Sequence, residues 1–226
     1  IGKGEARRRL GLEEGPWILF FGFIRRYKGL DLLLQALPLV RRRRPVRLLV
    51  AGEFYDDEQR YRDLVRAGGL EDAVVFYSDY IPEDQVAVHF SAADCVALPY
   101  HSATQSGIVP VAYHLDTPVI CTDVGGLSEV VLDNETGFVV RPDDPGALAD
   151  AIERFYAEQR EEAMREGVRR EKRKYSWEPL VAAIERLAGA APPGGGRSAE
   201  TASGGGRPAD TASKGGRAVD TPSGPG

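Results

Sequence analysis

Sulfur and imidazole side chains are scarce in this chain of 226 residues, which has two cysteines, one methionine and three histidines. Cys95 and Cys121 both fall in apolar stretches, so we predict buried thiols in a reducing compartment and neither a disulfide framework nor a zinc site. His89, His101 and His114 lack the spacing of metal ligands, and we predict structural or surface roles for them. His101 is the one to test, because it lies in a loop. The sequence therefore predicts no metal site.

An excess of charge and long apolar runs are missing too. The net charge is −5 and the pI is about 5.4, which predicts neither a nucleic-acid partner nor electrostatic attraction to a membrane. The basic run at 41–44 ends a helical pattern just before Pro45, where cations complement the helix dipole. No apolar run approaches the roughly 18 residues of a membrane span, and no signal peptide opens the chain. We therefore expect a soluble, cytoplasmic protein.

Residues 191–226 differ in kind from the rest of the chain. They contain three ten-residue Gly/Ser/Pro-rich repeats and a short stub, without a single aromatic residue. Such a segment cannot offset an ordering entropy of about 1–2 kcal/mol per residue, and its repeat has no apolar face to stack. We predict a disordered tail at 191–226 and one globular domain at 1–190.

Unbroken apolar runs alternate with helical periodicity through the globular part. The runs predict strands at 17–24, 46–51, 74–77, 94–98, 119–121 and 137–140. The helices are expected at 28–44, 57–67, 82–92, 107–115, 127–132, 144–169 and 177–188. Strands without polar alternation, each followed by a helix, are typical of a parallel sheet covered on both faces. The sequence thus predicts an α/β fold, a doubly wound, Rossmann-like sheet of about six strands, with ligands at the carboxyl ends of the strands.

The loop after the first strand, GFIRRYKG, concentrates positive charge. Gly22 permits a tight turn, and Arg25, Arg26 and Lys28 fall within four residues just before a helix. Cations and a helix N-terminus together favour a phosphate or diphosphate ligand. A solvated basic turn is the alternative. Neither a P-loop nor a G-x-G-x-x-G motif is present, so a P-loop NTPase and a simple NAD-binding domain are not supported.

Two more helix starts lie at the same predicted edge. One follows a loop without charge, in which Thr104, Ser106 and Gly107 offer hydroxyl and backbone N–H groups. The other follows Gly125-Gly126 and carries Glu129. Three such loops at one edge predict binding of a nucleotide or a sugar-nucleotide diphosphate.

Five blocks carry a family resemblance: FFGFIRRYKGLDLLLQAL, LLVAGE, VVFYSDYIP, ADCVALPY and TPVICTDVGGLSEVVLDNETGFVVRPDDPGALADAI. Together they resemble the C-terminal half of the group 1 (family 4) glycosyltransferases, over roughly Glu5 to Leu187. The resemblance implies one half of a GT-B fold that binds a nucleoside-diphosphate sugar, needs no cofactor and transfers a hexose with retention and without a metal.

The resemblance also implies roles for single residues. Lys28 matches a family lysine that holds the diphosphate, whereas Phe23 stands where the family has an arginine. We expect Arg25 or Arg26 to substitute for that arginine, and Lys28 with Arg25 to be catalytic. The remaining expected donor-binding residues are Gly22, Arg26, Glu53, Ile81, Thr104, Gln105, Ser106, Gly107, Gly125, Gly126 and Glu129.

One family motif is missing. The family's E-x7-E pair would fall on Ala103 and Val111, where its first glutamate supports the donor sugar and its second holds the ribose hydroxyls. The T-Q-S-G loop at 104–107 is expected to replace these carboxylates with amides and hydroxyls. Loss of donor binding is the competing interpretation.

The expected partners are a nucleotide-sugar donor and an N-terminal acceptor-binding domain in the full protein, while a membrane acceptor stays open. This half alone is expected to be inactive. The main alternative function is a non-catalytic, Rossmann-like nucleotide-binding or interaction module derived from such an enzyme. An epimerase acting on UDP-sugars shares the GT-B fold but has no support in these motifs.

Overall fold

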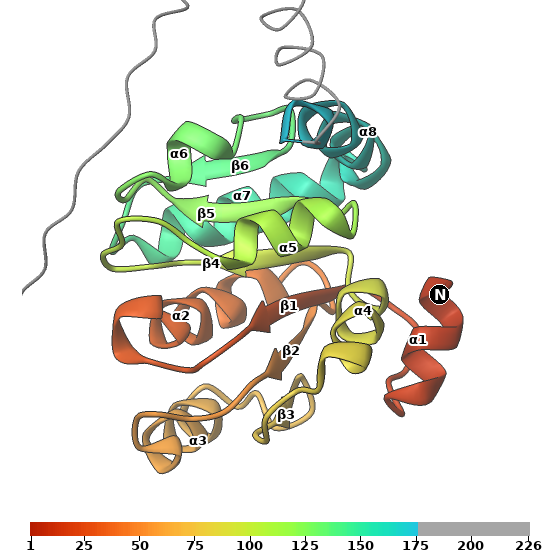
Figure 1. Cartoon of the computed structure of the whole chain (residues 1–226). Helices are drawn as coiled ribbons and strands as arrows, with labels where there is room; N and C mark the ends of the chain where they lie inside the picture. Colours follow the sequence, from red (N-terminus) through yellow and green to blue (C-terminus); the bar gives the residue numbers. More distant parts are fainter. Residues whose placement is uncertain (176–226) are drawn as a thin grey trace, which may run out of the picture. The chain divides into compact units, whose positions relative to one another are not determined.

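Six parallel strands form the centre of the fold (Figure 1), which is seen in a computed structural model that describes residues 1–175. The strands are β1 (Trp17–Phe21), β2 (Arg47–Ala51), β3 (Val74–Tyr77), β4 (Cys95–Leu98), β5 (Val119–Thr122) and β6 (Gly137–Val140). Their order is β3-β2-β1-β4-β5-β6 and all five pairings are parallel. This order reverses direction at β1 and β4, as in a doubly wound Rossmann-like sheet. The predicted fold class is confirmed.

Helices bury both faces of the sheet, as expected from strands that are apolar on both sides. One apolar cluster lies under α2 (Leu30–Arg41), α3 (Glu58–Ala67) and α7 (Pro145–Ala157). A second cluster lies under α1 (Lys3–Arg9), α4 (Glu83–Ala92), α5 (Ile108–His114) and α6 (Leu127–Val130). The helix α8 (Glu161–Lys172) contributes Met164 to the first cluster and Val168 to the second.

Several predicted elements end a few residues early: the strand expected at 17–24 ends at Phe21, the helix expected at 28–44 runs from Leu30 to Arg41, and the helix expected at 127–132 ends at Val130. Two larger differences concern whole elements. The single long helix expected at 144–169 is wrong, because the chain breaks between α7 and α8. Gln159 adopts a left-handed conformation with φ of 52°. The Arg160 amide donates to the Phe155 carbonyl at 2.9 Å, while the Arg160 guanidinium donates to the Asn134 carbonyl at 2.5 Å. Since the last contact joins residues far apart in sequence, local periodicity could not predict the break.

The helix α1 is the second difference, because its sequence KGEARRR carries no apolar stripe that would predict it. A short 3-10 turn, η1 (Arg26–Lys28), precedes α2, and another, η2 (Arg173–Tyr175), follows α8. The expected helix at 177–188, the domain boundary at 190 and the predicted disordered tail at 191–226 lie outside the described residues. None of the helices in residues 1–175 is long and apolar enough to cross a membrane.

A buried carboxylate joins α1 to the sheet. Asp94, which is 5% exposed, accepts hydrogen bonds from the Trp17 amide at 2.8 Å, the Arg7 guanidinium at 3.1 Å and the Tyr156 hydroxyl at 3.1 Å. The Lys3 ammonium forms an ion pair with the same carboxylate. Arg7 is itself 5% exposed, and removing one partner of a buried ion pair leaves an uncompensated charge.

We predict that Asp94→Ala lowers the free energy of unfolding by about 3–5 kcal/mol. Asp72→Ala is the matched control, because Asp72 pairs with Arg41 at an exposed position and such pairs contribute about 0–1 kcal/mol. Urea denaturation of both variants measures the difference. Equal losses in the two variants would contradict a structural role for the Asp94 cluster.

Candidate functional site

The loops after β1, β2, β3, β4 and β5 lie at the carboxyl edge of the sheet (Figure 1) and line three cavities. The first, which we call the lysine pocket, has a volume of about 230 Å³. Its lining residues are Phe21, Gly22, Phe23, Lys28, Gly52, Glu53, Tyr80, Ile81 and Ile108. It thus brings together four residues predicted from the sequence: Gly22, Lys28, Glu53 and Ile81.

Lys28 is the chemically unusual residue of this pocket. It is only 8% exposed, yet its ammonium group has no hydrogen-bond or ion-pair partner among residues 1–175. Burial, together with the nearby Arg25 guanidinium, lowers the pKa of Lys28. A buried cation without a partner is costly, and a bound anion would remove that cost.

Two glycines hold in place the segment between β1 and α2, residues 22–29, which we call the lysine loop. Gly22, at the end of β1, has φ of +98°, and a Cβ there would lie 3.2 Å from Lys28 Nζ and 3.1 Å from Ile108 Cδ1. Gly29, which follows Lys28, has φ of +68°, and a Cβ there would lie 1.8 Å from the Pro99 carbonyl oxygen. Both positions favour glycine for their positive φ, and at Gly29 a side chain would also collide with the backbone of Pro99. The lysine loop is therefore fixed against the loop after β4.

The loop without charge uses several of its own polar groups internally. The Ser106 hydroxyl lies 3.2 Å from the Tyr100 hydroxyl and accepts a hydrogen bond from the Ile108 amide at 3.2 Å. The Gly126 amide donates to the Thr104 carbonyl at 2.8 Å. Gly107, like Thr104 and Gln105 before it, is exposed, and a Cβ at Gly107 would meet no atom of the described residues within 4 Å.

The two positions of the missing carboxylates are apolar and partly buried. Ala103 and Val111 both pack against the apolar cluster under α4 and α5. Neither position presents a hydrogen-bonding side chain to the sheet edge. Of the described residues that line the lysine pocket, Glu53 is the one carboxylate.

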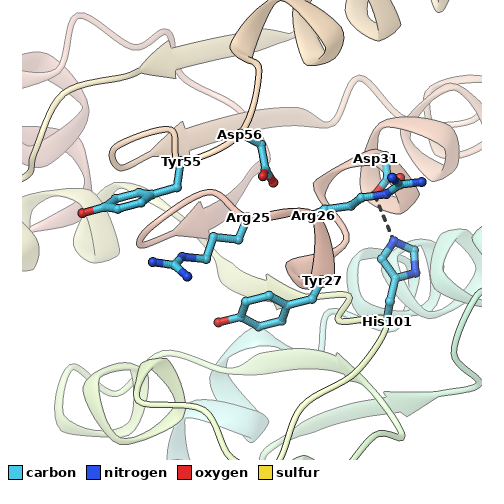
Figure 2. Close-up of a pocket in the computed structure, with 7 residues that line it drawn as sticks. All are labelled: Arg25, Arg26, Tyr27, Asp31, Tyr55, Asp56 and His101. Atoms are coloured by element: carbon cyan, nitrogen blue, oxygen red, sulfur yellow. Dashed lines mark hydrogen bonds and ion pairs between the residues drawn. The ribbon is translucent and has the colours of Figure 1, made fainter.

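The second cavity, which we call the arginine pocket, is lined by other residues of the same loop and measures about 710 Å³. Figure 2 shows its lining residues, which are Arg25, Arg26, Tyr27, Asp31, Tyr55, Asp56 and His101. The Arg25 guanidinium carbon lies 4.7 Å from the centre of the Tyr55 ring, a cation–π contact. The structure therefore places Arg25 and Arg26 in a different pocket from Lys28, although Arg25 is near enough to influence the lysine pKa.

His101 joins three elements at the wall of the arginine pocket. Its Nε2 lies 3.0 Å from Asp31 of α2, and its Nδ1 forms a hydrogen bond with Asp143, in the loop before α7. Burial lowers the pKa of His101, but the hydrogen bonds and charges of the two aspartates outweigh it, so the pKa is raised. Arg60 of α3 also donates to Asp31, at 3.1 Å. The charged imidazolium is the form that satisfies both carboxylates.

A raised pKa fixes the sign of the pH dependence. The stability that His101 contributes is fully present below its unfolded pKa of about 6.5 and is lost as the pH rises through its higher folded pKa. We predict that the difference in melting temperature between the wild type and His101→Gln shrinks as the pH rises from about 5.5 to about 8.5. His114→Gln, at an exposed position, is the control. A constant difference for His101→Gln would contradict the charged network.

The third cavity is a groove between α5 and α6 of about 700 Å³. It contains the predicted residues Gln105, Ser106, Gly126 and Glu129, among largely apolar neighbours. Thr104, Gly107 and Gly125 line none of the three cavities. The sequence prediction thus named residues of one sheet edge that the fold distributes over separate cavities.

Sequence reasoning missed the aromatic residues of this edge. Tyr27, Tyr55 and Tyr80 are 43%, 53% and 65% exposed, and Phe23 is 44% exposed. A signal was present, because Tyr27, Tyr55 and Tyr80 each come within four residues of the end of a predicted strand, where apolar runs usually give way to polar residues, and Phe23 lies at the end of the first predicted strand. Within residues 1–175 no three His, Cys, Asp or Glu side chains are grouped to hold a metal ion.

Comparisons with known proteins agree on a family. The sequence profile of the family described as "Glycosyl transferases group 1" matches residues 15–158. A D-inositol 3-phosphate glycosyltransferase of Xylanimonas cellulosilytica is 34% identical over 183 residues, which are 79% of this chain and 43% of that protein. The chain spans less than half the length of the curated relatives that it matches first.

Two solved structures have the same fold. The C-terminal domain of a glycosyl transferase group 1 family protein from Francisella tularensis superposes with a TM-score of 0.69 at 19% identity, covering 76% of this chain and 92% of that one. HepE of Anabaena, solved in complex with UDP-glucose, superposes with a TM-score of 0.69 at 20% identity, covering 82% of this chain and 52% of that one.

Proposed function

The chain belongs to the group 1 glycosyltransferases, and from that premise we propose that it is the donor-binding half of an enzyme that transfers a hexose from a nucleoside-diphosphate sugar to an acceptor hydroxyl. The Anabaena neighbour binds UDP-glucose, which supports UDP as the nucleotide to test first. The coverage of the relatives supports a further domain, expected N-terminal to this one, that binds the acceptor.

The observation that carries the proposal is Lys28, a largely buried residue that lines the lysine pocket and whose ammonium group has no partner among residues 1–175. A diphosphate in the lysine pocket would pair with it. As the bond to the sugar breaks, negative charge grows on the departing phosphate, and a fixed cation stabilises that charge more than it stabilises the ground state. A contact of the phosphates with the exposed backbone of Gly107 is part of the proposal, because its neighbour Ile108 lines the lysine pocket.

Other groups of the lysine pocket fit the remaining parts of a nucleotide. We assign the ribose hydroxyls to Glu53, because Val111 cannot accept hydrogen bonds from them. We assign the base to Tyr80 and Ile81, because both line the lysine pocket and one side chain is exposed while the other is half-buried. Arg25, expected to be catalytic, is proposed to act on this pocket only through its charge, because its side chain lines the arginine pocket.

The family resemblance extends the proposal to the whole reaction. As in the family, transfer would retain the anomeric configuration and would need no cofactor. It would need no divalent metal, because Lys28 supplies the charge that a metal supplies in other transferases. We also propose a cytoplasmic location, since both cysteines are free and buried. The acceptor, whether soluble or in a membrane, would bind mainly to the other domain.

The replaced carboxylates keep a second function open: a nucleotide-binding module without activity. It is favoured by the apolar side chains at Ala103 and Val111. Turnover of a UDP-sugar donor by the full-length protein, measured as release of UDP, distinguishes an active enzyme from a module without activity. In an active full-length enzyme, Lys28→Ala should lower kcat/KM by about two orders of magnitude. Sustained absence of turnover with intact UDP binding would instead support the module.

We predict that Lys28→Met weakens the binding of UDP to this chain by roughly ten- to a hundred-fold, because it removes a charged hydrogen bond to the diphosphate. Uridine, which has no phosphate, is the internal control, and its affinity should be the same for both proteins. Isothermal titration calorimetry measures both ligands. Equal losses of UDP and uridine affinity would show that Lys28 does not contact the diphosphate.

The lowered pKa of Lys28 predicts a pH dependence of binding. A bound diphosphate favours the charged ammonium, so binding raises the lysine pKa and takes up protons where the free lysine is partly neutral. Between about pH 7.5 and about pH 10, where the phosphates are fully ionised, the affinity for UDP should fall as the pH rises. Lys28→Met should remove this slope, and a slope that survives the substitution would assign it to another group.

A further inference from the structure

The arginine pocket contains charged side chains that form no hydrogen bond or ion pair with the described residues. The guanidinium groups of Arg25 and Arg26 and the carboxylate of Asp56 have no hydrogen-bond or ion-pair partner among the described residues. Asp31, by contrast, is engaged by Arg60 and His101. The two arginines therefore stay unpaired although carboxylates line the same cavity. Most other arginines of residues 1–175 form ion pairs. Arg42 and Arg43 are a second adjacent pair without ion pairs, but they line none of the three cavities, whereas Arg25 and Arg26 line this one.

The walls of the pocket are tied to one another. The Ile24 amide donates to the Glu53 carbonyl at 2.8 Å, and the Tyr55 amide donates back to the Ile24 carbonyl at 3.0 Å, which joins the loops after β1 and β2. The His101 amide donates to the Tyr27 carbonyl at 2.8 Å, which joins the loop after β4. These bonds fix the positions of the walls before any ligand binds, which reduces the entropy cost of binding.

Aromatic rings complete the chemistry of the pocket. Tyr27 and Tyr55 are both about half exposed, and Arg25 lies against the Tyr55 ring. In Figure 2, Arg25, Tyr27 and Tyr55 extend to one side of the pocket, while Arg26 extends toward Asp31 and His101 on the other. Aromatic faces stack on the apolar faces of sugar rings, carboxylates accept hydrogen bonds from hydroxyls, and guanidinium groups bind phosphate or carboxylate groups.

We propose that the arginine pocket binds an anionic carbohydrate, that is, a sugar or cyclitol that carries a phosphoryl or carboxylate group. The anionic group binds the guanidinium groups of Arg25 and Arg26, Asp56 accepts from ring hydroxyls, and the rings of Tyr27 and Tyr55 contact the sugar face. The pocket is separate from the lysine pocket, so a nucleotide and the anionic carbohydrate occupy the chain together. That this carbohydrate is the acceptor, or part of it, rests on the proposed function; its binding does not.

The test measures binding to the chain of 226 residues by calorimetry, with and without saturating UDP. The ligands are glucose 6-phosphate and inositol 1-phosphate for the phosphoryl class and glucuronic acid for the carboxylate class. Glucose, inositol and inorganic phosphate are the controls for the two halves of the ligand. The variant is Arg25→Gln/Arg26→Gln. Its matched control is Arg42→Gln/Arg43→Gln, an adjacent exposed pair at the end of α2 that removes the same charge.

We expect saturable binding of at least one anionic carbohydrate, weakened ten-fold or more by Arg25→Gln/Arg26→Gln and unchanged by Arg42→Gln/Arg43→Gln. The phosphoryl and carboxylate arms identify the anionic group. Three results would overturn the proposal: no saturable binding, equal affinity for inorganic phosphate alone, or equal losses in the two double variants. Binding that persists when UDP does not bind would uphold this site and reject the proposed function instead.

Discussion

A largely buried lysine without a counter-ion, on the wall of a pocket, is the constraint on which the rest of this site depends. Lys28 is the last residue of a 3-10 turn and is followed by Gly29, whose backbone lies against the loop after β4. The absence of a side chain at Gly22 leaves space for the Lys28 ammonium group. The surrounding fold holds the charge in place rather than neutralising it. In a sheet whose strands are buried on both faces, such a charge is stable only if other interactions offset its cost or a ligand restores its partner.

The chain follows the rule that ligands of doubly wound sheets bind beyond the carboxyl ends of the strands. The lysine loop contributes to two cavities at that edge. Lys28 lines one with Glu53 and Ile81, while Arg25 and Arg26 line another with Tyr55. A loop with three cations in four residues thus supplies two pockets of different chemistry. The proposed division is nucleotide on one side and anionic carbohydrate on the other.

Much of the fold could be predicted from the sequence, because the apolar runs at β1 to β6 are short, unbroken and separated by clear helical periodicity. The break at Gln159 and the helix α1 could not, since they depend on contacts between distant residues, such as Arg160 with Asn134 and Arg7 with Asp94. The site shows the same limit. Their spacing in the sequence predicted that Arg25, Arg26 and Lys28 form one cluster. The direction of each side chain depends on the 3-10 turn and, for Arg25, on the contact with Tyr55, which follows a different strand.

The most direct test of the role assigned to Lys28 is a crystal structure of the chain with UDP-glucose. We predict that the diphosphate lies in the lysine pocket within hydrogen-bond distance, about 2.7–3.2 Å, of Lys28 Nζ, with the ribose at Glu53. A diphosphate bound instead to Arg25 and Arg26 in the arginine pocket, or in the groove between α5 and α6, would contradict that role.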